Sequence, residues 1–175
     1  MSGGTLSGSA AVFFLHNRRM SEDVFRAHLA DVLDWKNAHA GFDAAVDGIP
    51  ADMRGRRAEG FPHSPWELLE HLRIAQRDIL EFCVDPHYKE MKWPDDYWPP
   101  AGQNPTAEQW ERSLAEFRKD RAAMKKLAAE GDLYSKIPHG SGQTILREIL
   151  LVADHNAYHV GQLVLVRRAL GAWPG

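Results

Sequence analysis

Apolar residues recur at spacings of three and four over most of this chain, a pattern typical of amphipathic helices. The first such segment spans residues 21–46, where one stripe consists of His28, Val32, Trp35, His39, Phe42 and Val46. Gly48 and Pro50 follow, so the pattern predicts a helix that ends just before them. The preceding residues 1–20 are rich in Gly and Ser, and we expect them to form a flexible or short-helical leader.

A second helix is marked by its own start signal. In the stretch HSPWELLEHL, Ser64 is placed as an N-cap, Pro65 occupies the first helical position, and Glu67 completes a Ser-x-x-Glu capping box. The apolar stripe that follows predicts a helix to about Cys83.

The last two helices are also bounded by local signals. Thr106 and Gln109 form a second capping box, and the predicted helix continues to Gly131. A final helix is predicted over residues 144–170, where Gly171 suits the left-handed conformation of a helix end. Four long helices without a convincing strand predict an all-α protein, a four-helix bundle in a single domain over residues 21–175.

Residues 84–105, between the second and third predicted helices, show no helix or strand period. They contain five prolines and four aromatic residues, so the segment is too apolar for disorder. We expect a long aromatic and Pro-rich loop that folds over one end of the bundle. Its aromatic residues either line a pocket or only plug that end.

Composition narrows the function classes. The 175 residues carry a net charge of -3, with 21 Lys and Arg against 24 Asp and Glu, which gives no basic surface for nucleic acid. We expect no membrane association, and the single cysteine, Cys83, fits a cytoplasmic protein without disulfides. Near the start, positive charges follow the short apolar run of residues 10–15, the wrong order for a secretory signal.

Histidines occupy apolar positions of two predicted helices. His155 and His159 lie one turn apart on the inner side of the last helix, and an i,i+4 pair of this kind is a common metal clamp. His71 lies beside Leu68 and Leu72 in the apolar stripe of the second helix. Facing helices can present three imidazoles to one point, and a site of three histidines leaves a coordination position open, as catalytic sites do. Three unrelated core histidines are the alternative.

The stretches HSPWELLEHLRIAQRDIL, KWPDDYWP and GQTILREILLVADHNAYHVGQLVLVRRALG resemble the DinB-like (DinB/YfiT) superfamily, and the likeness extends from about Ser21 over most of the chain. The resemblance implies an up-down-down-up bundle in which His71, His155 and His159 bind one divalent ion, commonly zinc or nickel. It implies no DNA binding. Relatives are often dimers, and the largely apolar last helix leaves surface for a homodimer.

The resemblance also implies two kinds of function. The first is a metal-dependent enzyme, a transferase or hydrolase, that activates a low-molecular-weight thiol or water against a small electrophilic substrate in a pocket covered by residues 84–105. The second is a non-enzymatic, stress-related metal-binding protein in which the ion only ties two helices together. In HExxH proteases a glutamate after the first histidine acts as the general base. Asn156 occupies that position here, which disfavours peptide hydrolysis by this mechanism. The candidate bases are Glu67, Glu70, Glu148 and Asp154.

Six further residues are candidates for contacts with the ligands or with a substrate. Tyr158 and Gln162 flank the histidine pair on the last helix, although hydrogen bonds between helices would also explain them. His39 shares the inner stripe of the first helix, where a histidine is commonly a hydrogen-bonded core residue. The loop supplies the other three, which are Trp93, Tyr97 and Trp98.

Overall fold

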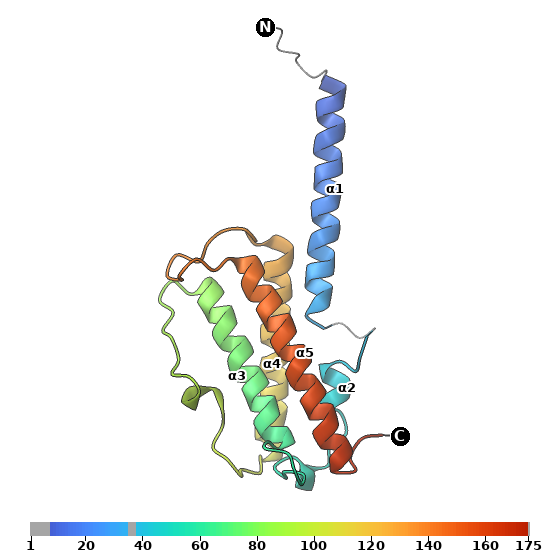
Figure 1. The fold of residues 1–175 in the computed structure, drawn as a ribbon, viewed down its shortest axis with the longest axis vertical. Coiled ribbons are helices and arrows are strands. Elements are labelled where there is room, and N and C mark those ends of the chain that lie inside the picture. The colour runs from blue at the N-terminus through green and yellow to red at the C-terminus, as the bar shows by residue number, and fades with distance from the viewer. Residues whose placement is uncertain (1–7, 35–37, 175) are drawn as a thin grey trace.

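The computed structural model describes the backbone of residues 8–34 and 38–174 and the side chains of residues 20–34 and 38–174. Within these residues the protein is all-α, without a β-strand (Figure 1). The elements are α1 (Gly8–Val32), α2 (Phe42–Val46), the 3-10 helix η1 (Ala51–Met53), α3 (Pro65–Val84), the 3-10 helix η2 (Asp95–Tyr97), α4 (Ala107–Glu130) and α5 (Ile145–Ala169).

The helices α3, α4 and α5 pack against one another along their lengths (Figure 1). α3 and α4 run in the same direction, because the long segment between them returns along the outside of the bundle; α1 and α5 run in the opposite direction. The C-terminal half of α1 packs against α4, and its N-terminal half extends past the end of the other helices. α3 and α5 are also direct neighbours.

The prediction of one continuous helix over residues 21–46 is wrong. α1 already begins at Gly8, so the described part of the predicted leader is helical, and it ends at Val32; a separate helix, α2, starts at Phe42. Gly41 precedes α2 in an extended conformation. The predicted stripe is also wrong before the break, because Leu29 and Leu33 are buried there, whereas His28 is exposed and Val32 is only partly buried. Trp35 and residues 1–7 lie outside the described residues.

The predicted start of α3 is confirmed. Ser64 Oγ accepts a hydrogen bond from the Glu67 amide at 3.2 Å, and Glu67 Oε2 accepts one from the Ser64 amide at 2.7 Å. Arg57 adds an ion pair, with 2.6 Å between its Nη2 and Glu67 Oε1. The same carboxylate accepts a hydrogen bond from the amide of Gly102, so it joins α3 to the segment before α4.

The boundaries predicted for α4 and α5 are also confirmed. Thr106 and Gln109 form the reciprocal capping box, and Gly131 ends α4. α5 runs over Ile145–Ala169, and Gly171 follows it with φ of 72°, in the left-handed region that favours glycine.

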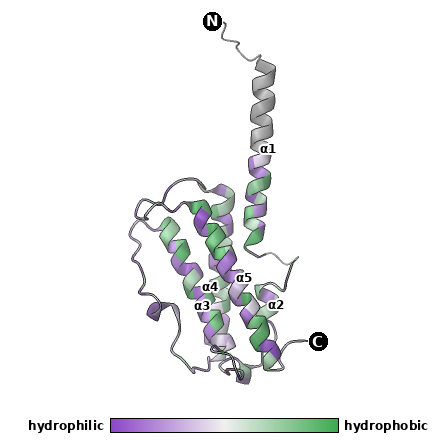
Figure 2. Cartoon of the chain, viewed as in Figure 1, coloured by the Kyte–Doolittle hydropathy of each residue, from purple (hydrophilic) through white to green (hydrophobic). Residues whose placement is uncertain are grey.

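Each of α3, α4 and α5 carries both apolar and polar residues along its length, as helices with one buried side do (Figure 2). The buried residues form two apolar clusters, one around Leu69 and Phe117 and the other around Met124 and Ile149. Two buried amides also join the three helices: Gln76 donates to the Phe117 carbonyl at 2.8 Å and accepts from Asn156 at 2.9 Å. No described helix has the length and apolar character needed to cross a membrane.

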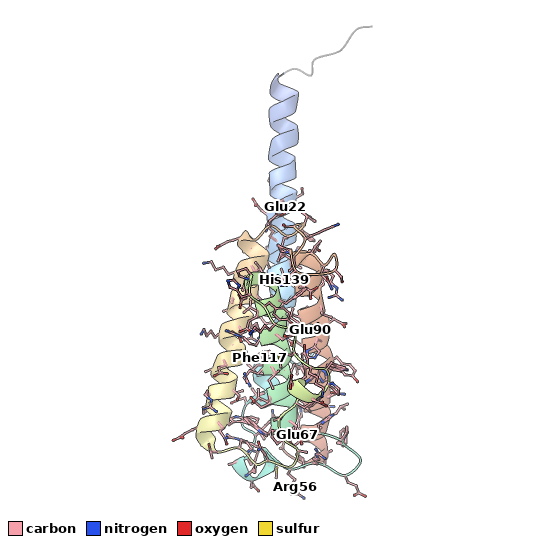
Figure 3. The ribbon with its side chains drawn as sticks, turned by 90° about the vertical axis from the view of Figure 1, so that its left-hand side faces the viewer. Glu22, Arg56, Glu67, Glu90, Phe117 and His139 are labelled. Atoms are coloured by element: carbon pink, nitrogen blue, oxygen red, sulfur yellow. The ribbon has the colours of Figure 1, made fainter. Side chains whose placement is uncertain are left out.

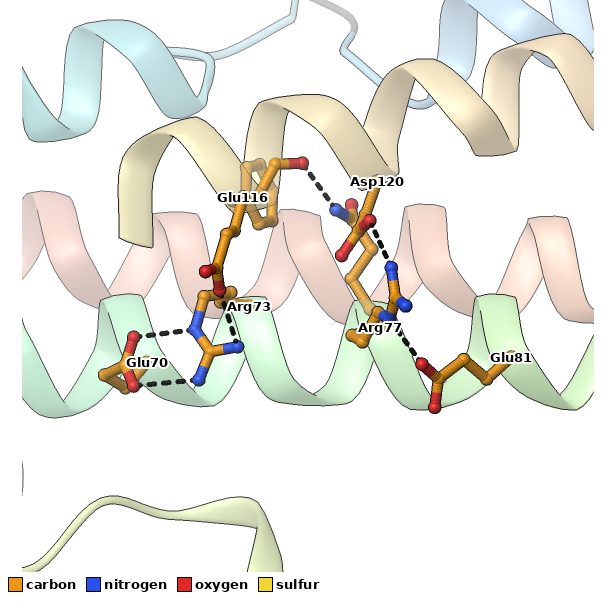
Figure 4. A network of polar contacts seen from close by, with 8 residues as sticks. Glu70, Arg73, Arg77, Glu81, Glu116 and Asp120 are labelled. Carbon is orange, nitrogen blue, oxygen red and sulfur yellow. Dashed lines mark hydrogen bonds and ion pairs between the residues drawn. The ribbon is translucent and has the colours of Figure 1, made fainter. Parts of the chain in front are cut away.

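Ion pairs connect the outer sides of α3 and α4 (Figure 4). Arg73 contacts Glu70 at 2.8 Å and Glu116 at 3.1 Å, and Arg77 contacts Asp120 at 3.1 Å. Glu70 and Asp120 are buried, so the two arginines balance their charges and also fix how the two helices align. The carboxylate of Glu70 is engaged here, on the outer side of α3.

Candidate metal centre

The structure brings the three predicted histidines to one point between α3 and α5. The Nε2 atom of His71 lies 3.1 Å from the Nε2 of His159 and 3.1 Å from the Nε2 of His155. One nitrogen of each ring falls within 4.8 Å of the other two. His71 and His159 are buried, and His155 is partly buried. No carboxylate or thiol of the described residues joins this group, so its donors there are three imidazoles.

The outer ring nitrogens of two of the histidines face oxygen acceptors. His71 Nδ1 lies 2.9 Å from the backbone carbonyl of Tyr97, and His159 Nδ1 lies 2.7 Å from Oε1 of Gln162. A carbonyl oxygen can only accept, so each Nδ1 carries the proton and each Nε2 presents a lone pair. Two lone pairs 3.1 Å apart repel each other, and a cation between them removes that repulsion.

A metal ion fits this arrangement. Tetrahedral zinc with metal–nitrogen distances of about 2.0–2.1 Å places its ligands about 3.3 Å apart, close to the 3.1 Å observed. Acceptors on the outer ring nitrogen are the usual partners of metal-bound histidines, because they fix the tautomer and the ring orientation. His155 Nδ1 is buried without a hydrogen-bond partner among the described residues, so that ring lacks such support.

An aromatic stack also supports His71. The ring of Trp98 lies 3.8 Å from the ring of His71, with an angle of 1° between their planes, and the other face of Trp98 stacks on His63 at 4.0 Å. His63 is itself partly buried against Trp98. The segment between α3 and α4 thus contacts His71 through both the Tyr97 carbonyl and the Trp98 ring.

Burial keeps the three imidazoles neutral. It lowers the pKa of His71 and His155 to about 4 and also lowers the pKa of His159. Nearby imidazoles add to this effect for His71 and His155, since two positive charges at this separation repel each other. Neutral imidazole is the form that binds a metal ion, so the site is ready for one at pH 7.

The same shifts predict how the stability of the metal-free protein depends on pH. The folded-state pKa values of His71 and His155 lie below the unfolded value of 6.5, so the unfolded chain takes up protons first as the pH falls. These groups have no effect above pH 6.5, and between pH 7 and 5.5 they should lower the free energy of unfolding by about 2 kcal/mol. Urea unfolding after chelator treatment measures this; a midpoint that stays constant over this range would contradict it.

A cavity of about 390 Å³ adjoins the three histidines. Its apolar wall includes Ile79, Phe82 and Leu151, and the segment after α3 contributes Tyr88, Glu90, Trp93 and Tyr97. Two of the predicted pocket residues, Trp93 and Tyr97, therefore line it. The cavity gives the three nitrogens access to a space large enough for a small molecule.

Comparison with known families now identifies the chain. The model of the DinB superfamily matches residues 34–163, which include the three histidines and every residue that lines the cavity. The chain belongs to the DinB superfamily. Proteins of this superfamily bind metal ions, in agreement with the geometry of the three imidazoles. Neither the curated proteins nor the solved structures contain a match to the chain.

Other predicted residues of this DinB-superfamily protein lie apart from the cavity. His39 is exposed and lines a separate cavity of about 350 Å³, with its Nδ1 3.0 Å from the carbonyl of Ala40. His28, expected in the inner stripe of the first helix, is exposed. Tyr158 is 64% exposed and contacts His159 only by an edge-on ring contact at 4.9 Å. Gln162, in contrast, bonds directly to His159.

The structure also places the four candidate bases. Asp154 is exposed, Glu70 pairs with Arg73, and the carboxylate of Glu67 is used by the start of α3. Glu148 is the one among them that lines the cavity; it is 2% exposed and forms an ion pair with Arg147 at 2.7 Å.

Sequence reasoning missed the contribution of Asp78. This buried carboxylate lines the cavity and accepts hydrogen bonds from the hydroxyls of Tyr88 at 2.9 Å and Tyr97 at 2.6 Å. Asp78 lies seven residues after His71, two turns along the same side of α3, so the helical period could have found it. By anchoring the Tyr97 side chain, Asp78 helps to hold the Tyr97 carbonyl against His71.

Replacing Asp78 by asparagine should weaken metal binding by about 10-fold, because the anchored tyrosine and its carbonyl lose a charged acceptor. Competition with a chromophoric chelator measures the affinity. Asp154→Asn is the matched control, since it removes the same charge next to His155 from an exposed position. Equal affinities of the two variants would show that Asp78 does not support the site.

Proposed function

We propose that this protein is a metal-dependent enzyme of the DinB superfamily that activates a small thiol or water against a small electrophilic substrate. The proposal depends on one observation: three imidazole Nε2 atoms converge beside a cavity of about 390 Å³. A structural site would have a fourth protein ligand, and no fourth His, Cys, Asp or Glu of the described residues joins the group.

The proposal also covers the identity of the ion and the order of the helices in the bundle. A bound zinc or nickel ion would act as a Lewis acid and lower the pKa of a thiol or water. The four long helices would form the up-down-down-up bundle of the superfamily, with residues 84–105 as a cover over the site. The directions of α1, α3, α4 and α5 support this arrangement.

The chain's own residues have distinct parts in this proposal. His71, His155 and His159 hold the ion, while the Tyr97 carbonyl and Gln162 fix the ring orientation of two of them. Phe82 and Leu151 form an apolar wall that limits water around the substrate. Glu148 and Asp78 are the buried carboxylates of the cavity; Asp78 is bonded to two tyrosine hydroxyls, so we assign Glu148 the role of accepting a proton from the thiol or water.

A non-enzymatic metal-binding function is the second candidate. It is favoured by the engagement of the buried carboxylates, since Glu67, Glu70 and Glu148 each pair with an arginine. In that case the ion would mainly tie α3 to α5. A possible stress-related role would follow from the stability that the ion adds to the fold.

Two measurements test the proposal. Elemental analysis of the purified protein should find one divalent ion per chain, and a panel of small thiols with electrophilic substrates should show turnover that chelation abolishes. Glu148→Gln should retain the metal and lose most of the turnover, because the amide cannot accept the proton. Metal binding without turnover across the panel would favour the non-enzymatic function, and absence of metal would refute both.

We also propose a cytoplasmic homodimer. Three large apolar side chains of α5 are at least half exposed, namely Leu150, Tyr158 and Leu165, and a second copy would cover them. Sedimentation of the protein at micromolar concentration decides between monomer and dimer.

A further inference from the structure

One side of the cavity beside the histidines, formed by the segment after α3, combines aromatic rings with a carboxylate. Tyr88, Trp93 and Tyr97 line this side together with Glu90, and the rings of Trp93 and Tyr97 lie 5.2 Å apart at an angle of 61°. Trp93 is 69% exposed, so most of its indole surface is uncovered by the described residues. That ring is therefore available to a ligand in the cavity.

The charged side chains of this cavity are unbalanced. Among the described residues that line it, Arg147 is the only one with a positive charge, and it is paired with Glu148 at 2.7 Å. Two other carboxylates remain, on Asp78 and Glu90. Asp78 accepts hydrogen bonds from two tyrosine hydroxyls, which neutralise no charge. Without a metal ion, the lining side chains therefore have an excess of negative charge.

Glu90 is the carboxylate available to a ligand. It makes no hydrogen bond or ion pair with a described residue, and it lies on the side of the molecule where the segment after α3 crosses the helices (Figure 3). Burial raises the pKa of Tyr88 and Tyr97, and the charges of Asp78 and Glu90 add to that rise. Glu90 and both phenol rings line the same cavity, so one ligand can reach all three.

We propose that the side of the cavity formed by the segment after α3 binds the ammonium group of a small organic cation. A cation is attracted by the faces of aromatic rings and by an unpaired carboxylate, and recognition of alkylammonium groups by such rings is well established. In the metal-free cavity an anionic group would meet the excess negative charge and be repelled. The inference rests on the proposed function and extends it by giving its substrate a positive charge.

The test compares three ligands of nearly the same shape. Choline carries a quaternary ammonium, 3,3-dimethylbutan-1-ol is its neutral carbon analogue, and 3,3-dimethylbutanoate is an anion of similar size. Calorimetric titration of the full chain after chelator treatment should show that choline binds about 3- to 30-fold more tightly than the neutral alcohol, the range expected of cation–π attraction, and that the anion binds most weakly, because no ion is present to bind its carboxylate. Equal binding of choline and the alcohol, or tighter binding of the anion, would overturn the proposal.

Two cavity variants and one control test whether the preference for choline depends on this cavity. Glu90→Gln and Trp93→Ala should each reduce the preference for choline over the alcohol, whereas Glu111→Gln, a change at an exposed glutamate of α4, should leave it unchanged. Circular dichroism establishes that all three variants fold. A preference that survives both cavity changes would show that choline binds elsewhere and would overturn the proposal.

Titrations of the zinc-loaded, chelator-treated and His71→Ala proteins separate this inference from the proposed function. The preference for choline should persist in all three, because Glu90 and Trp93 are not among the candidate ligands. A protein that binds no metal yet prefers choline would refute the metal-dependent function and retain the cation site. A preference lost together with the metal would overturn the cation site, since its own residues would then not suffice.

Discussion

The His71→Ala variant is expected to bind zinc or nickel at least 100-fold more weakly than the wild type. Changes to residues that only support a ligand typically cost 10- to 100-fold in affinity, and this change removes a ligand. Its loss leaves His155 and His159, both on α5, so the link between α3 and α5 disappears as well. Competition with a chromophoric chelator gives the affinity, and elemental analysis gives the metal content.

His87→Ala is the matched control for this variant, because it removes an imidazole from an exposed position of the segment after α3. We expect it to bind metal as the wild type does. Unchanged stoichiometry and affinity in His71→Ala would mean that any bound ion lies elsewhere, and the site formed by the three histidines would be ruled out.

The Glu67→Ala variant should have the second large effect, on stability. The Glu67 carboxylate accepts hydrogen bonds from the amides of Ser64 and Gly102 and pairs with Arg57. Its removal leaves a buried helix start without its acceptor and should lower the free energy of unfolding by about 2–3 kcal/mol. Glu111→Ala, on the exposed side of α4, should change it by less than about 0.5 kcal/mol. Urea unfolding at pH 7 measures both.

The pH dependence of stability gives a separate check on Glu67. Burial alone would raise its pKa, but the hydrogen bonds from Arg57 and Ser64 outweigh it and lower the pKa from 4.5 to about 2. Because the folded-state pKa is the lower one, the contribution is complete above pH 4.5 and is lost as the pH falls toward 2. Glu67→Gln should lack this loss while still accepting backbone hydrogen bonds. If the stability of Glu67→Gln fell with pH as that of the wild type does, another group would be responsible for the loss of stability in acid.

The helix boundaries that were predictable from the sequence are those with a local cause. Ser64 with Glu67, and Thr106 with Gln109, bond to each other within four residues, so three-residue spacing contains the whole interaction. The break before α2 was not predictable from the apolar period. The three- and four-residue spacing of the sequence runs on through the break, and it assigned His28 and His39 to a buried side although both are exposed.

The contacts of the candidate site were likewise only partly predictable from the sequence. The spacing of His155 and His159 and the apolar neighbours of His71 were sufficient to expect that the three would meet. The stack of His63, Trp98 and His71, and the contact of Tyr97 with Asp78, join residues from different segments through the path of an irregular loop. No period governs such a path, so these contacts required coordinates.

The acceptor that fixes the tautomer of His71 is a main-chain oxygen. Every amino acid at position 97 has that atom, so the side chain there can change without removing the oxygen itself. A replacement that keeps a hydroxyl bonded to Asp78 would also keep the carbonyl against His71, so substrate choice can change at this loop position while metal binding is retained. This offers a physical route by which one ancestral centre could acquire different chemistries while its imidazoles stay the same.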